Sequence, residues 1–156
     1  MGTLILYATK HGAAREIAEG ISKHIDDAVV CDLKGGDLPA VSGFDCVIIG
    51  GSLYAGAIAK EAKAFLKQHA DDLRDKRIGL FLSGMDEGRE QTYFAENFPP
   101  DLLQAARATG FLGGIFDPAK VGVMGRFIMK LVAKQAVYTN TIDEGKIRAF
   151  AERVKA

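Results

Sequence analysis

The chain has 156 residues, a length typical of one domain and too short for two well-packed ones. Hydrophobic residues make up 48% and charged residues 26%, which excludes a disordered or fibrous protein. Twenty Lys and Arg residues balance twenty Asp and Glu residues, so we expect no uniformly basic surface for nucleic acid. The composition indicates a single globular domain over residues 1–156.

The two cysteines, Cys31 and Cys46, are too few for a disulfide scaffold, and their spacing fits neither a redox pair nor a zinc site. The first residues carry no basic stretch before their apolar run, so we expect no signal peptide. No run of about 18 apolar residues is present to span a bilayer. We therefore expect a cytoplasmic protein whose cysteines are core residues.

Short apolar runs alternate with amphipathic segments along the chain. In chain order, the first half is expected to form a strand over Thr3–Ala8, a helix over Ala14–His24, strands over Ala28–Asp32 and Cys46–Gly50, and a helix over Lys60–His69. The second half is expected to form a strand over Arg77–Leu82, a helix within Pro99–Arg107, a strand over Thr109–Phe116, and helices over Gly122–Gln135 and Ile142–Val154. This alternation predicts an α/β fold: an open, doubly wound, five-stranded parallel sheet with helices on both faces.

The loops after the first, third and fourth predicted strands are expected to meet at the carboxyl edge of this sheet, where such folds bind ligands. Thr9–Ala14 leads directly into a helix, so its backbone N–H groups can bind an anion. Ser52–Gly56 holds an apolar pair at the edge of the sheet, and Ser83–Asp86 offers backbone groups to a heterocycle. Each loop also has a purely structural interpretation. Thr9–Ala14 can be a plain strand-to-helix turn, Tyr54 can pack on a neighbouring helix, and Ser83–Asp86 can be a solvated acidic loop.

The phosphate loops of several other α/β families are absent. The chain has no GxxxxGK[ST] motif, and no GxGxxG motif follows the first predicted strand. Neither cysteine is followed, six positions later, by the arginine that a phosphatase loop requires. These absences disfavour a P-loop NTPase, a dinucleotide-binding domain and a cysteine phosphatase.

The loop Thr9–Ala14 resembles the [ST]-x-T-G-x-T phosphate loop of the flavodoxin superfamily, with matches at Thr9 and Gly12 and departures at His11 and Ala14. The resemblance implies a sheet in the order 2-1-3-4-5 and bound flavin mononucleotide (FMN). It implies a phosphate site at Thr9, Lys10, His11, Gly12, Ala13 and Ala14. The isoalloxazine ring would lie between Ser52, Leu53, Tyr54, Ala55 and Gly56 on one side and Ser83, Gly84, Met85 and Asp86 on the other.

Within that superfamily the chain resembles the menaquinone-dependent protoporphyrinogen dehydrogenases, from Thr3 to Val154. The shared features include Gly125–Leu131 and the following Val137–Thr139, which imply an extra helix after the fifth strand. The segment Ser83–Asn97 is shorter and more acidic than the corresponding insertion of those enzymes. This resemblance implies a quinone or tetrapyrrole as a redox partner, with a partner protein as the alternative.

The predicted helix Gly122–Gln135 carries Arg126, Lys130 and Lys134 at four-residue intervals beside an apolar stripe. A basic amphipathic helix can lie on an anionic membrane surface, and it can equally cover a core with its charges in solvent. Peripheral contact with the inner face of the membrane is therefore one of two interpretations of this segment.

These observations predict an FMN-binding redox protein in which the flavin carries the chemistry. No Ser-His-Asp set, carboxylate pair or metal cluster is evident, so we nominate no catalytic side chain and no metal ligand. Electron transfer and flavin-dependent oxidoreductase activity, including protoporphyrinogen oxidation, both remain open. A flavin-free interaction module is the alternative that the missing hydroxyl at Ala14 favours.

Overall fold

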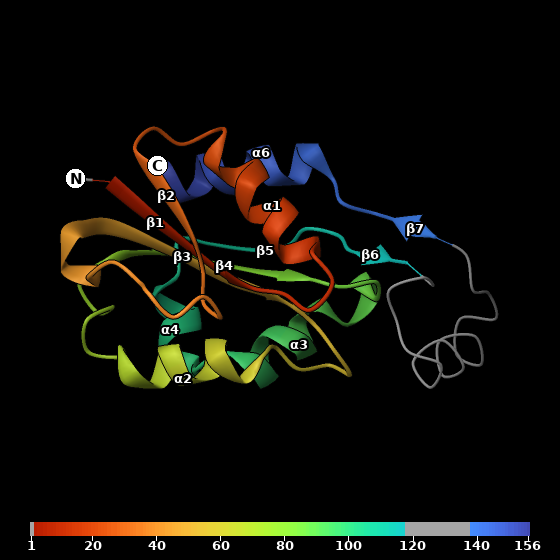
Figure 1. Ribbon diagram of the computed structural model, residues 1–156, viewed down its shortest axis with the longest axis horizontal. Helices are drawn as coiled ribbons and strands as arrows, with labels where there is room; N and C mark the ends of the chain where they lie inside the picture. Colours follow the sequence, from red (N-terminus) through yellow and green to blue (C-terminus); the bar gives the residue numbers. More distant parts are fainter. Residues whose placement is uncertain (1, 118–137) are drawn as a thin grey trace.

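The computed structural model describes residues 2–117 and 138–156. Its centre is a parallel sheet of five strands in the order β2-β1-β3-β4-β5, which confirms the expected fold (Figure 1). The three central strands are apolar runs whose middle residues are buried on both faces, whereas the edge strand over Ala28–Asp32 is only partly buried. The five strands are β1 (Gly2–Ala8), β2 (Ala28–Asp32), β3 (Phe44–Ser52), β4 (Arg77–Ser83) and β5 (Ala108–Phe111).

Helices cover both faces of the sheet and divide the core into two layers. Figure 1 shows α1 (Ala13–Ser22) and α6 (Glu144–Lys155) on one face. It shows α2 (Lys60–Gln68), α3 (Glu90–Asn97) and α4 (Pro100–Ala105) on the other. Successive side chains of a strand point to opposite faces, so β1 sends Leu4 and Leu6 to the layer of α2 and Ile5 to that of α1.

The expectation of one strand over Thr109–Phe116 is wrong. β5 ends at Phe111, and Ile115–Phe116 forms a separate strand, β6, that pairs antiparallel with β7 (Thr139–Asn140). The break lies at Gly113, whose φ of 98° is in the left-handed region. A Cβ atom at this position would also lie 2.1 Å from the backbone oxygen of Thr141. The apolar run therefore continues in sequence while the chain leaves the sheet.

The segment after β4 is also more structured than the sequence indicates. It contains a short 3-10 helix, η2 (Glu87–Arg89), and then α3. Within α3 only Phe94 and Asn97 are buried, so the helix lacks the apolar stripe by which amphipathic helices are found. A second 3-10 turn, η1 (Val41–Gly43), precedes β3.

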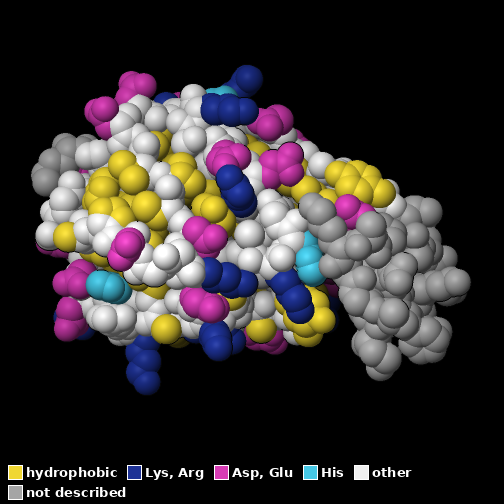
Figure 2. Space-filling view, in the orientation of Figure 1, with side chains coloured by type: hydrophobic (Ala, Val, Ile, Leu, Met, Phe, Trp, Pro, Cys, Tyr) yellow, Lys and Arg dark blue, Asp and Glu magenta, His cyan; other side chains and the backbone are white. Residues whose placement is uncertain are grey.

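Basic and acidic side chains are interspersed over the face shown in Figure 2, in keeping with the balanced charge of the chain. Cys46 is buried and Cys31 partly buried, and both are free thiols. In residues 2–117 and 138–156, no helix is long and apolar enough to cross a membrane. The predicted helix Gly122–Gln135 and the segment Gly125–Leu131 lie outside the described residues.

Candidate functional site: a hollow between three loops

The three loops singled out in the sequence do meet at the carboxyl edge of the sheet. They line a hollow of about 100 Å³, which we call the three-loop hollow. The segment Gly114–Ile115, which follows β5, completes its wall and was not expected there. The remaining lining residues are Lys10, His11 and Ala13 from the first loop, Ser52, Leu53 and Tyr54 from the second, and Ser83, Gly84 and Met85 from the third.

Not every predicted residue reaches this hollow. Thr9, Gly12 and Ala14 are not among its lining residues; their hydrogen bonds shape the start of α1. Ala55 and Gly56 form the tight turn closed by paired backbone hydrogen bonds between Tyr54 and Ala57. Asp86 is exposed at the start of η2 and is not among the lining residues.

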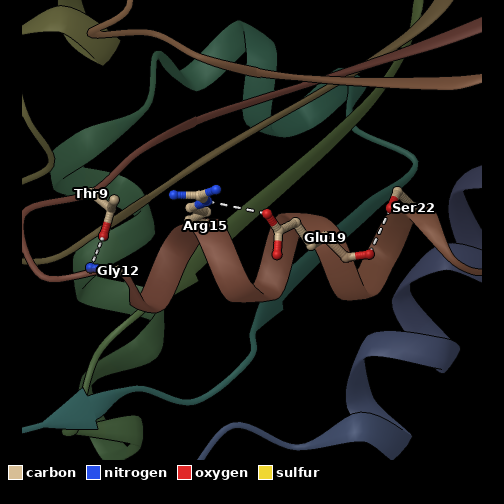
Figure 3. Close-up of polar contacts among 5 residues, drawn as sticks. All are labelled: Thr9, Gly12, Arg15, Glu19 and Ser22. Atoms are coloured by element: carbon tan, nitrogen blue, oxygen red, sulfur yellow. Dashed lines mark hydrogen bonds and ion pairs between the residues drawn. The ribbon is translucent and has the colours of Figure 1, made fainter.

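The start of α1 has the features that an anion site requires. Gly12 has a φ of 100°, a left-handed conformation that glycine adopts without strain, and it turns the chain from β1 into the helix. The Gly12 backbone N–H donates to Thr9 Oγ1 at 2.9 Å, as Figure 3 shows. The positive end of the α1 dipole and its first N–H groups therefore lie beside a hydroxyl at the edge of the hollow.

Ser52 supplies a second hydroxyl to this terminus. Its Oγ accepts the Ala14 backbone N–H at 3.1 Å and lies 3.2 Å from Thr9 Oγ1. The hydroxyl that Ala14 lacks in the loop sequence thus comes from the end of β3 instead. Each hydroxyl has one proton to donate, and the contact between Thr9 and Ser52 uses one of the two. The other proton is available to an anionic ligand.

Lys10 and Tyr54 form the outer wall of the three-loop hollow. Lys10 Nζ lies 3.7 Å from the centroid of the Tyr54 ring, a cation–π contact. Tyr54 is 55% exposed and lines the hollow, so it is not packed into the core on a helix. Met85, on the third loop, is 38% exposed. Large apolar groups held in solvent around a hollow are typical of a site for a flat, apolar ligand.

Asn97, at the end of α3, holds the second loop in place and was missed by the sequence analysis. Its side chain is buried, with 6% of the residue exposed. Oδ1 accepts the Ile58 backbone N–H at 3.0 Å, and Nδ2 donates to the backbone oxygens of Gly56 at 3.0 Å and Tyr93 at 2.8 Å. One amide therefore fixes the turn that carries Tyr54.

The third loop is tied to both of its neighbours. The Leu53 backbone N–H donates to the backbone oxygen of Ser83 at 2.8 Å, and that of Gly84 donates to Gly113 at 3.1 Å. Farther along, Glu87 pairs with Lys146 of α6, and the hydrogen bond to Glu87 raises the pKa of the Lys146 ammonium. These contacts hold the second and third loops at a fixed separation.

An open, doubly wound α/β sheet with a hollow beside the ends of its first, third and fourth strands defines the class of this protein. The family model of the flavodoxin domain matches residues 4–142. The chain therefore belongs to the flavodoxin family. Among curated proteins no match was found.

Solved flavodoxins share the fold at low sequence identity. The flavodoxin of Streptococcus pneumoniae TIGR4 is 16% identical, with a TM-score of 0.61 over 98% of this chain and 97% of its own. Flavodoxin 2 of Bacillus cereus is 21% identical, with a TM-score of 0.59 over 99% and 98%. A Fusobacterium nucleatum flavodoxin variant bound to flavin mononucleotide is 14% identical, with a TM-score of 0.59 over 99% and 96%.

Proposed function

We propose that this protein binds FMN in the three-loop hollow and acts as a flavin-dependent redox protein. The family match and the FMN-bound neighbour from Fusobacterium nucleatum support FMN as the cofactor. The observation that carries the proposal is the pair of hydroxyls, Thr9 and Ser52, at the start of α1. This pair provides a hydroxyl donor, backbone N–H groups and a positive helix end at one point, which is the donor set that a phosphate requires.

FMN, when bound, supplies the chemistry of electron or hydride transfer, and the chain supplies placement and electrostatics. Thr9 and Ser52 would hold the phosphate at the α1 terminus. Tyr54 and Met85 would exclude water from the faces of the ring, and Lys10 would keep the Tyr54 ring in position through its cation–π contact. At about 100 Å³ the three-loop hollow is smaller than most cofactor sites, which measure about 300 Å³ or more, so it must widen to admit the ring.

The more specific functional assignments depend on a smaller part of the chain. Protoporphyrinogen oxidation, a quinone or tetrapyrrole partner and membrane contact depend on features within Gly122–Tyr138, most of which lies outside the described residues. None of the reported comparisons names that activity, so these assignments stay predictions. The flavin-free alternative loses its basis, because Ser52 provides the hydroxyl whose absence at Ala14 suggested it.

The proposal is tested by titrating the apoprotein with FMN and following the quenching of flavin fluorescence. We expect one FMN per chain. Thr9→Val keeps the side-chain shape and removes the hydroxyl, and one charge-assisted hydrogen bond is worth about 1.5 kcal/mol or more. The variant should therefore bind FMN about tenfold more weakly.

Riboflavin and Ser22→Ala provide the matched controls. Riboflavin lacks the phosphate, so Thr9→Val should leave its affinity unchanged. Ser22 lies at the opposite end of α1, where its Oγ donates to the backbone oxygen of Glu19, so Ser22→Ala should bind FMN normally (Figure 3). An equal loss of riboflavin and FMN affinity in Thr9→Val would place the phosphate elsewhere. A wild-type protein that binds no FMN would refute the proposed function.

A further inference from the structure

The strand β2 forms one edge of the sheet, and no strand in the described part of the chain pairs with its outer side. The edge of a sheet carries N–H and C=O groups that can pair with another chain. Many proteins block such an edge with Pro, Lys or a bulge, but Ala28–Asp32 contains no Pro or Lys, and its register with β1 is unbroken. The outer side of β2 is therefore open to a further strand.

The hydrogen bonds to β1 show which backbone groups of β2 face outward. The Leu33 N–H donates to the backbone oxygen of Tyr7 at 2.8 Å, so the odd-numbered residues of β2 pair with β1. The outward-facing N–H and C=O groups belong to Ala28, Val30 and Asp32. The Asp32 oxygen accepts the Gly35 N–H at 2.9 Å, whereas its N–H still points outward.

Apolar side chains accompany these backbone groups. Val29 is 42% exposed. Cys31 lies two positions later, on the same face of the sheet, and is only partly buried. Figure 2 looks onto this edge and shows hydrophobic side chains gathered over β2, in the left half of the view. An apolar surface beside an open strand edge is typical of a protein interface.

A second copy of the chain fits this edge. With a two-fold axis at Val30, antiparallel pairing brings the outward-facing groups of Val30 against those of Val30 in the other copy. Ala28 of each copy then pairs with Asp32 of the other. Val29 lies opposite Cys31 of the other copy, so the apolar side chains of the two edges meet.

The charges at the two ends of β2 are complementary in this arrangement. Asp26 precedes the strand, Lys34 follows it, and both are exposed. Antiparallel pairing places Asp26 of one copy at the same end as Lys34 of the other, and the symmetry does so twice. Lys34 Nζ donates to the backbone oxygen of Thr9 at 2.9 Å, which leaves two N–H groups for a carboxylate. The Asp32 carboxylate is held within its own turn, where it accepts the Lys34 backbone N–H at 2.8 Å.

We infer that two copies of this protein associate through their β2 edges, antiparallel about Val30, so that one sheet continues through both copies. No residue from 26 to 34 lines the three-loop hollow, so the inference goes beyond the proposed function and does not rest on it. The protein should dimerise with or without FMN.

Multi-angle light scattering of the full-length protein over a range of concentrations tests the association. It should show twice the chain mass of 16.7 kDa. Val29→Lys puts an ammonium group into the apolar surface and should weaken dimerisation about tenfold or more, with an unchanged circular dichroism spectrum. Thr109→Lys makes a matched change at an exposed position of β5, the opposite edge, and should remain dimeric. A monomer at every concentration, or a dimer that Val29→Lys leaves intact, would overturn the inference.

A disulfide tests the register of the two strands. Val29→Cys places a thiol opposite the native Cys31 of the other copy, in a non-hydrogen-bonded pair whose Cα atoms lie about 4.5 Å apart, within the range of a disulfide. Mild oxidation should give a covalent dimer on a non-reducing gel. The same substitution combined with Cys31→Ser should give far less. A dimeric Val29→Cys protein that does not cross-link would overturn the proposed pairing.

An exchange of charges tests the ends of the interface. Lys34→Glu should weaken dimerisation, because it sets two carboxylates against each other at both ends. Adding Asp26→Lys should restore dimerisation, since it re-forms the pair with the signs reversed. A double variant that dimerises no better than Lys34→Glu alone would contradict the antiparallel arrangement.

Discussion

Replacing Asn97 with leucine should destabilise the protein strongly, although leucine is similar in size. The substitution removes three hydrogen bonds, to the backbone of Gly56, Ile58 and Tyr93. At about 1 kcal/mol each, their loss amounts to about 3 kcal/mol. The Ile58 N–H, in a residue that is 4% exposed, is also left without a partner, which adds a desolvation cost of about 1 kcal/mol or more.

Urea unfolding followed by circular dichroism measures this loss. With a slope of about 2 kcal/mol per molar urea, a total loss of about 4 kcal/mol should lower the midpoint by about 2 M. Asn97→Asp tests the mechanism. One carboxylate oxygen can still accept the Ile58 N–H, but the other replaces the NH2 donor and faces the backbone oxygens of Gly56 and Tyr93, which it cannot hydrogen-bond. It should also be destabilised at neutral pH.

Gln104→Leu, on the exposed side of α4, is the matched control and should change stability by less than about 0.5 kcal/mol. A loss below about 1 kcal/mol in Asn97→Leu would refute the assignment of Asn97 as the residue that fixes the second loop. If the assignment holds, the same variant should also bind FMN more weakly, because the turn that carries Tyr54 is no longer held.

Two further predictions concern the backbone and the thiols. Gly113→Ala should lower the free energy of unfolding, measured in urea, by more than about 2 kcal/mol, because it combines a left-handed φ with a clash against the backbone. Gly43→Ala is the control, because a Cβ atom there meets open space, and it should lower the free energy of unfolding far less. Equal losses in the two variants would contradict the predicted strain at Gly113. Burial raises the pKa of the Cys31 and Cys46 thiols, so labelling by a disulfide reagent should be slow at neutral pH and faster as pH rises, with Cys46 reacting only in denaturant. The unfolded chain releases the thiol protons at lower pH than the folded chain does, so the free energy of unfolding should fall as pH rises above the ordinary thiol pKa. Rapid labelling of both thiols in the native protein would contradict their burial.

The sheet and the meeting of its loops could be predicted because both depend on local sequence. Four of the five strands are short apolar runs with clear ends, and the order of strands and helices fixes which loops share the carboxyl edge. The fifth strand was predicted too long because the hydrophobic pattern of the sequence does not reveal the left-handed turn at Gly113.

The parts of the site that escaped prediction depend on contacts between distant segments. Ser52 was expected beside the flavin ring, but its bond to the Ala14 N–H joins residues 38 positions apart, and no local motif encodes it. Asn97 was missed because α3 has almost no apolar stripe and a buried amide has no sequence signature. The one available signal was a polar residue directly before the apolar Phe98.

The hydroxyls of Thr9 and Ser52 have a consequence for how the protein acquires its cofactor. They already accept the N–H groups of Gly12 and Ala14, so folding leaves neither of these two amides without a partner. Under the proposed function, the chain can therefore fold before it binds its flavin, and FMN binding would exchange hydrogen-bond partners at a helix terminus that is already formed.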